Sequence, residues 1–148
     1  MTKHFYIFLT LLLATMLLSL PAASADSPND ILVVANKTVK VDAVSVAELK
    51  AIFLKKKVRW KTGLKAVPIN AKDGTELKKE FLKRVFDMDQ DLERSYWQDQ
   101  KIRTGLVPPV TFRQLLKAVF NIRGSVSYVF RSQYREGVVK ILLVLPAQ

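Results

Sequence analysis

The sequence predicts an α/β fold: a single compact domain whose mixed, partly parallel sheet is flanked by helices. Two observations lead to this prediction. Short apolar runs of strand length alternate along the chain with segments whose apolar residues recur at helical spacing. The first run, Ile31–Ala35, is continuously apolar, as expected for a strand that is buried on both faces. Strands that alternate with helices favour a sheet with parallel neighbours.

The first half of the domain contains two predicted helices around a second strand. Ser45 and Glu48 have the spacing of a capping box, which predicts a helix that ends near Lys55. Residues 64–70 alternate in polarity and include β-branched side chains, so they predict a strand. Residues 75–86 predict a helix. Its expected inward-facing residues are Leu77, Phe81, Leu82 and Val85.

A third helix is expected over about residues 89–101, with Leu92, Tyr96 and Trp97 toward the core. The segment Val107-Pro108-Pro109 then interrupts the helical pattern, because proline lacks the backbone donor that a helix interior needs.

Thr111 is the expected N-cap of a fourth helix, because the apolar residues that follow recur at i, i+3, i+4, i+7 and i+8. Gly124 lies just past the end of this pattern, where glycine commonly terminates a helix. Residues 125–130 and 138–145 predict two further strands. The apolar residues of the fourth helix are Phe112, Leu115, Leu116, Val119 and Phe120.

The first 25 residues have the pattern of a secretory signal peptide. Lys3 precedes the apolar run Phe5–Leu20, and the small residues ASA at positions 23–25 form a cleavage site. Cleavage there would leave residues 26–148 as a periplasmic domain. The alternative is an uncleaved anchor, because the apolar stretch approaches membrane-spanning length. No cysteine follows the run, so we expect no lipid-modified N-terminus.

The chain has no cysteine, and its one histidine, His4, lies in this N-terminal segment. A mature domain without either residue excludes zinc or copper sites built on His and Cys, histidine-dependent nucleophiles and disulfides. Asp87, Asp89 and Asp91 form an acidic cluster, but acidic residues near the start of a helix are what its dipole favours. We therefore expect no catalytic residue, no metal and no cofactor, and a protein that is not an enzyme.

The formal net charge of +11 favours an anionic ligand, a polyanion or an anionic membrane surface as partner. A basic surface without a specific ligand is the alternative. The stretch PINAKDGTELKKEF, residues 68–81, shows where a small anion could bind. A strand ends there in a polar turn, and the backbone N–H groups of a starting helix favour negative charge.

Three segments occur in a suggestive order: ELKAIFLKKKVRWKTG (48–63), VPINAKDGTELKKEFLKRVF (67–86) and RGSVSYV (123–129). Together they resemble the phosphate-binding-protein-like family of periplasmic solute receptors. Members of that family have a helix that ends in Phe-x-Gly, followed by Trp. A strand then leads into an Arg-x-Asp-x-Ser-Gly-Thr phosphate loop, and a Gly-x-Ile-Gly-Tyr strand comes later. The resemblance extends over nearly all of residues 31–144.

The resemblance implies a type II periplasmic-binding-protein fold, in which two α/β lobes close on an oxyanion. This chain is about half as long as a complete receptor and is similar mainly to the lobe that carries the Ser-Gly-Thr loop. Either a second copy or another chain supplies the opposite wall, or the protein is no longer a high-affinity receptor.

Carried over by position, Gly74 and Thr75 match the Gly-Thr of the phosphate loop, while Gly124 and Tyr128 match the later strand motif. The chain also departs from the family pattern. Lys55 replaces the glycine of Phe-x-Gly, Asp73 replaces the loop serine, and Asn70 or Lys72 replaces the arginine. The residues that the resemblance implies as oxyanion ligands are Asn70, Lys72, Asp73, Gly74 and Thr75.

Asp73 separates two interpretations of this turn. As an N-cap, it would accept a hydrogen bond from the N–H of Thr75 or Glu76, which a bound phosphate would also need. Its carboxylate would repel an oxyanion 4 Å away by about 4 kcal/mol at an effective dielectric constant of 20. Lys72, Lys78 and Lys79 lie near enough in sequence to offset part of this repulsion.

A second candidate is the basic loop at residues 55–61, which could hold a polyanion while Trp60 stacks on it. Alternatively, Trp60 packs in the core and the cations are solvated. The basic residues of this loop are Lys55, Lys56, Lys57, Arg59 and Lys61.

We therefore predict an exported solute-binding protein for phosphate or a related oxyanion, accessory to ABC-type phosphate uptake. The alternative is a basic periplasmic module that contacts a polyanion or a partner protein, with the ancestral ligand site degenerate. A transporter or envelope protein and a second copy of the chain are the protein partners that we consider. Nucleic acid is not an expected partner.

Overall fold

The computed structural model describes residues 25–148 as an α/β domain on a five-stranded mixed sheet. The strand order is β3-β2-β4-β1-β5, in which β2 is parallel to both β3 and β4, while β1 is antiparallel to β4 and β5. The expected signal peptide lies almost entirely outside the described residues and stays a prediction. The strands are β1 (Ile31–Ala35), β2 (Val67–Ala71), β3 (Val110–Phe112), β4 (Ser125–Phe130) and β5 (Lys140–Leu145).

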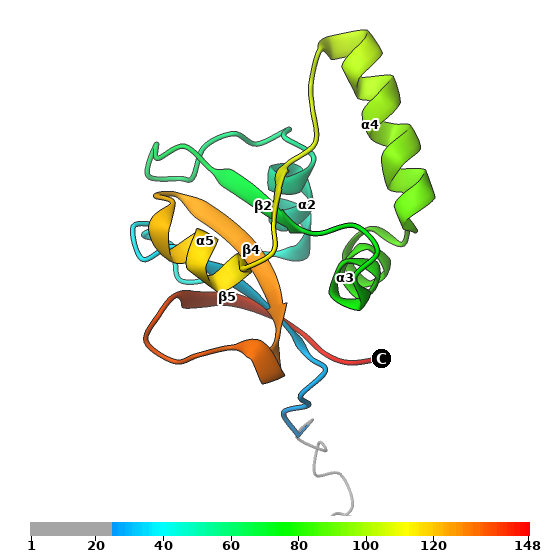
Figure 1. Ribbon diagram of the computed structural model, residues 1–148. Helices are drawn as coiled ribbons and strands as arrows, with labels where there is room; N and C mark the ends of the chain where they lie inside the picture. Colours follow the sequence, from blue (N-terminus) through cyan, green and yellow to red (C-terminus); the bar gives the residue numbers. More distant parts are fainter. Residues whose placement is uncertain (1–24) are drawn as a thin grey trace, which may run out of the picture.

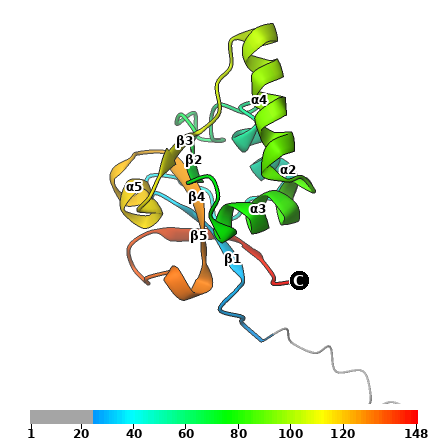
Figure 2. The same ribbon diagram turned by 45° about the vertical axis from the view of Figure 1, so that its right-hand side comes forward.

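Helices cover both faces of this sheet. Figure 2 shows α5 on one face and α2 with α3 on the other, while α4 extends beyond the sheet. Within residues 25–148, no helix combines the length and the apolar character needed to cross a membrane. The helices are α2 (Val46–Phe53), α3 (Glu76–Phe86), α4 (Gln90–Thr104), α5 (Leu115–Asn121) and the short 3-10 helix η2 (Arg131–Gln133).

The core confirms the prediction for the first strand, because all five residues of β1 are completely buried. The apolar residues that were expected to face inward from α3 are also all buried. Phe81 from α3 stacks on Tyr128 from β4 with ring centroids 3.6 Å apart and planes 4° apart. This aromatic contact joins α3 to the sheet.

Trp60 packs in the core rather than at the surface. Its side chain is buried, and its Nε1–H donates a hydrogen bond of 2.8 Å to the carbonyl oxygen of Gly124. Gly124 has φ +77°, and a Cβ there would lie 2.2 Å from the carbonyl oxygen of Lys65. Trp60 and Lys65 thus approach Gly124 so closely that no residue with a side chain fits at position 124.

The third helix was predicted to bury Leu92, but Leu92 is 55% exposed and α4 buries only Trp97. The reason is visible in Figure 1, where most of α4 projects away from the sheet. A helix that contacts the core near one residue leaves its other apolar side chains in water.

The prediction that Thr111 caps a helix is wrong. Residues 110–112 form β3 and pair in parallel with β2, and α5 begins only at Leu115, without a side-chain cap. Val110, Thr111 and Phe112 are β-branched or aromatic, so an extended conformation is locally favourable. Phe112 and Phe120, two of the apolar residues at helical spacing in that expected helix, are exposed.

Candidate functional site

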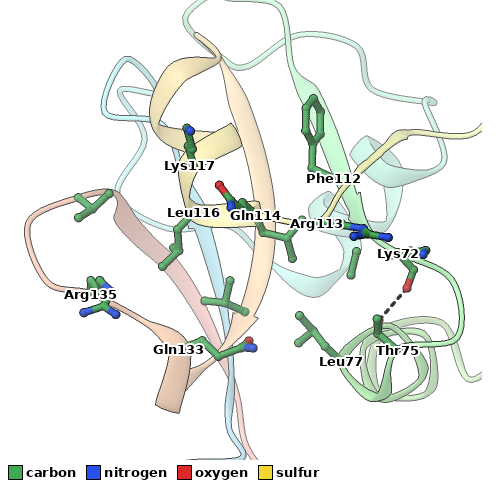
Figure 3. Close-up of a pocket in the computed structure, with 14 residues that line it drawn as sticks. Lys72, Thr75, Leu77, Phe112, Arg113, Gln114, Leu116, Lys117, Gln133 and Arg135 are labelled. Carbon is green, nitrogen blue, oxygen red and sulfur yellow. Dashed lines mark hydrogen bonds between the residues drawn. The ribbon is translucent and has the colours of Figure 1, made fainter.

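A cavity of about 590 Å³ lies where β2, β3 and β4 end. These three strands point in the same direction, so their carboxyl ends meet at one edge of the sheet. Ligands of α/β proteins commonly bind at such an edge. The cavity lies between α5, the start of α3 and the segment after β4 (Figure 3). It is lined by Ala71, Lys72, Thr75, Leu77, Phe112, Arg113, Gln114, Leu115, Leu116, Lys117, Val129, Gln133, Arg135 and Val138.

Four cations line this cavity: Lys72, Arg113, Lys117 and Arg135. No carboxylate is among the lining residues, and none of the four cations forms an ion pair or donates a side-chain hydrogen bond to another described residue. Of the six other arginines in the described residues, four form ion pairs, for example Arg94 with Asp91 and Arg103 with Asp99. The cavity therefore holds positive charge that the described part of the chain leaves uncompensated.

The topology brings these cations together from distant parts of the sequence. Lys72 follows β2, Arg113 follows β3, Lys117 lies near the start of α5 and Arg135 follows η2. Figure 3 shows Lys72 and Arg113 near one another at one end of the cavity, with Arg135 at the opposite end. Lys72 was predicted from the sequence, whereas Arg113, Lys117 and Arg135 were not, because no local motif marks them.

The five oxyanion ligands predicted from the resemblance do not converge on one point. Lys72 and Thr75 line the cavity. The N–H of Gly74 instead donates a hydrogen bond of 2.8 Å to the Oε1 of Gln90 in α4. Asn70 and Asp73 line a different hollow, which faces α4.

Asn70 belongs to a buried polar network on that second side. Its Oδ1 accepts a hydrogen bond of 3.2 Å from the hydroxyl of Tyr128, and this hydroxyl accepts one of 3.1 Å from the N–H of Ala71. Burial raises the pKa of Tyr128 far above its ordinary range, and the Ala71 N–H opposes this shift only in part. Tyr128 is therefore a neutral donor at physiological pH, and Asn70 has a structural partner.

Asp73 is not the N-cap of α3, contrary to the first interpretation of the turn. Thr75 has that role, because its Oγ1 accepts from the N–H of Lys78 at 3.4 Å and donates to the carbonyl of Lys72 at 2.7 Å. The Asp73 carboxylate lies 2.5 Å from the Nζ of Lys78. This ion pair offsets the repulsion that Asp73 would exert on a nearby anion.

Three of the five basic side chains in the loop at residues 55–61 contact other groups of the protein. Lys57 pairs with Glu48, and Arg59 donates to the carbonyl of Gly63 at 2.9 Å. The Nζ of Lys55 lies 3.4 Å from the carbonyl of Pro108, and burial, with a smaller effect of Lys65, lowers the pKa of Lys55. Lys56 and Lys61 form no ion pair with the described residues. Since Trp60 is buried, it cannot stack on a ligand.

The three residues of the acidic cluster, Asp87, Asp89 and Asp91, lie at the end of α3 and the start of α4. Asp89 is the N-cap of α4 and accepts from the N–H of Leu92 at 2.8 Å, while Asp91 pairs with Arg94. Asp87 is the left-handed C-cap of α3, with φ 53°. Within residues 25–148, no group of three His, Cys, Asp or Glu side chains is placed to hold a metal ion.

No family model matches this sequence, and no curated protein matches it. Solved structures do share its fold. The ABC-type phosphate transport receptor of Vibrio cholerae has a TM-score of 0.60 at 11% identity, covering 78% of this chain and 47% of the receptor. A phosphate ABC transporter substrate-binding protein of Clostridium perfringens, solved with bound phosphate, has a TM-score of 0.58 at 14% identity, with coverages of 78% and 45%.

PstS of Borrelia burgdorferi has a TM-score of 0.58 at 12% identity, and the match covers 78% of this chain and 50% of PstS. At such identities the similarity concerns the fold. This chain spans about half the length of each receptor. It therefore has a fold that resembles one lobe of a PstS-type phosphate-binding protein.

Proposed function

We propose that the protein binds phosphate or a related oxyanion, without catalysis, in the cavity between α3 and α5. The observation that carries this proposal is the set of four unpaired cations at the carboxyl ends of parallel strands. The solved structures of similar fold are those of phosphate receptors and substrate-binding proteins, which supports a binding role.

Arg113 supplies the planar guanidinium that the turn after β2 lacks. It lies beside Lys72 in Figure 3, so an oxyanion at this end of the cavity would meet two cations from adjacent strands. A guanidinium can donate two parallel hydrogen bonds to one oxyanion, which an ammonium cannot do with the same geometry. We therefore assign the anion contact to Arg113 and Lys72.

Calorimetric titration of the purified protein with sodium phosphate tests this function. We expect Arg113→Gln to weaken binding about tenfold or more, because a hydrogen bond to a charged group contributes about 1.5–3 kcal/mol. Lys83→Gln is the matched control, since it removes one exposed cation from α3 outside the cavity. Absence of saturable phosphate binding by the folded protein, or equal losses in both variants, would remove the proposal.

The matched fold corresponds to about half of each phosphate receptor, and the cavity on this single lobe is accessible to water, which weakens contacts with an anion. We propose that a second copy of the chain or a transporter component covers it during uptake. Light scattering with and without phosphate distinguishes these two partners. A dimer that forms with phosphate supports the second copy, and a monomer in both conditions favours a different protein.

We further propose that the protein is exported to the periplasm after cleavage behind Ala25, which rests on the sequence pattern at residues 3–25. Mass spectrometry of the intact protein from an envelope fraction tests this directly. A mature N-terminus at Asp26 supports export, whereas retention of Met1 would indicate an anchor.

The second candidate is a basic module for a polyanion or a partner protein. It is favoured by one observation: Asn70 and Asp73 face α4 instead of the cavity, so the turn does not form a complete anion loop. A polyanion would bind with an affinity that falls steeply with salt, because many counterions are released. Phosphate binding that largely survives moderate salt argues against this candidate.

A further inference from the structure

The walls of the cavity between α3 and α5 are mostly apolar, although its charged residues are all cations. Leu77 and Val129 are buried behind it, and Leu116 and Val138 are half-buried along it. Phe112, at the end of β3, is 40% exposed and also lines it. A phosphate ion alone would contact the cations and leave Leu116, Val138 and Phe112 exposed to water.

The size of the cavity also exceeds what inorganic phosphate needs. At about 590 Å³ it falls within the range that holds a drug-sized organic ligand, about 300–1,000 Å³. Sites for such ligands combine mainly apolar walls with a few charged or polar groups that fix orientation. The four cations and the seven apolar side chains of this cavity have that composition.

Figure 3 shows how the two kinds of side chain are arranged. Arg113 and Lys72 lie at one end, Leu77 lies near the middle, and Leu116 points from α5 into the space toward the segment that carries Arg135. A ligand with an anionic group against Arg113 would thus place the rest of its body against Leu116. Val138 also lines this cavity.

We propose that the ligand of this cavity is an organic oxyanion, such as a phosphate monoester whose ester group is an apolar chain of several carbon atoms. The inference deepens the proposed function and rests on the same anion contact. The cations hold the phosphoryl group, and the apolar walls discriminate in favour of the monoester over the inorganic ion.

Titration of the purified full chain with methyl, butyl and hexyl phosphate, far below micelle-forming concentrations, tests this proposal. Each methylene that is fully buried strengthens binding about fourfold. Because the cavity is open on one side, we expect a total gain of at least about tenfold from methyl to hexyl phosphate. Hexanol, which has the chain but no charge, is expected to bind more weakly than hexyl phosphate.

Val138→Thr is the first variant, because it keeps the side-chain shape and replaces a methyl group by a hydroxyl. Leu116→Gln is the second. We expect both to reduce the gain in affinity from methyl to hexyl phosphate. Val144→Thr on β5 is the matched control, since Val144 is exposed and does not line the cavity.

The outcomes separate this inference from the proposed function. Phosphate binding with no dependence on chain length overturns the inference and leaves the proposed function standing. Binding of hexyl phosphate but not of inorganic phosphate, sensitive to Val138→Thr, supports the inference and rejects phosphate as ligand. No binding of any member rejects both. Binding only to vesicles that contain phosphatidic acid, with none to soluble hexyl phosphate, also overturns the inference.

Discussion

Lys78 of α3 and Glu93 of α4 form an ion pair that is almost entirely shielded from water, with the Nζ of Lys78 2.9 Å from an Oε of Glu93. The side chains are 5% and 12% exposed. Lys78 also pairs with Asp73, so one buried ammonium joins two helices and the turn after β2. The turn after β2, which borders the cavity, is therefore fixed in place by ion pairs that also involve α4.

Replacing Lys78 by methionine would leave the Glu93 carboxylate nearly buried without its cation. We expect Lys78→Met to lower the free energy of unfolding by about 3 kcal/mol in urea titrations, because breaking a buried pair leaves an uncompensated charge. Lys79→Met is the control. Lys79 is exposed and lies 3.9 Å from Glu76, so its loss should change stability by less than about 0.5 kcal/mol. Equal effects of the two variants would contradict this assignment.

Tyr128→Phe removes the hydroxyl between Asn70 and Ala71. We expect a loss of about 1–3 kcal/mol at neutral pH, because the buried N–H of Ala71 and the Oδ1 of Asn70 lose their partner. Urea titrations measure this loss. Phe86→Leu, a substitution of a partly buried ring that donates no hydrogen bond, measures the effect of a core change alone.

The difference in stability between the natural protein and Tyr128→Phe should also change with pH in the alkaline range. Burial raises the folded pKa of Tyr128 above that of the unfolded chain, so the unfolded state loses its proton first. The contribution of the protonated Tyr128 hydroxyl to the free energy of unfolding is present below about pH 10. It is lost as the pH rises, by at most about 1.4 kcal/mol per pH unit. The stability advantage of the natural protein over Tyr128→Phe should therefore shrink above pH 10. An advantage that does not depend on pH would contradict the burial of this hydroxyl.

Gly124→Ala should be among the most damaging single substitutions. The alanine Cβ would meet the Lys65 carbonyl oxygen at 2.2 Å in a backbone conformation with φ +77°, so we expect a loss of about 3 kcal/mol in urea titrations. Gly137 is a matched control with φ +79° and no atom near its Cβ position. Gly137→Ala should cost about 1 kcal/mol, the conformational part alone. Similar losses at both positions would contradict this prediction, because they would show that the Lys65 backbone shifts to accommodate the added Cβ.

Asp30 ties the start of the domain to its end. Its pKa is lowered mainly by the N–H groups of Ala147 and Ser27. Burial opposes this shift, and Arg131 lowers the pKa by smaller amounts. A lowered folded pKa stabilises the protein above about pH 4, and this contribution is lost as the pH falls through the folded pKa. We expect Asp30→Asn to lower stability at pH 7 and to make acid unfolding less steep in circular dichroism. Asp42→Asn, at an exposed site, should leave the acid transition unchanged.

The fold could be predicted from the sequence wherever local patterns and tertiary packing agree. Ile31–Ala35 and the apolar face of α3 are such cases. Residues 110–112 are not, because their helical spacing with Leu115 and Val119 competes with the strand preference of Val110 and Thr111. Pairing with β2 decides in favour of the strand, and this partner is invisible in a local window.

The candidate site was less predictable for a related reason. Lys72 lies in a recognisable turn, whereas Arg113 and Arg135 reach the same cavity only through the parallel order of β3, β2 and β4. The two prolines before β3 are a signal for an extended segment that the helical periodicity outweighed. Recognising that strand would have placed Arg113 at the same sheet edge as Lys72.

The strand β3 also bears on how the protein behaves at high concentration. It is the last strand on its side of the sheet, so the backbone groups on its outer edge are free to pair with a foreign strand. It has only three residues, follows Pro108 and Pro109, and ends at the cation Arg113. An incoming strand would find few hydrogen bonds on this edge and a like charge on another copy, which are the features that protect natural sheets from edge-to-edge aggregation.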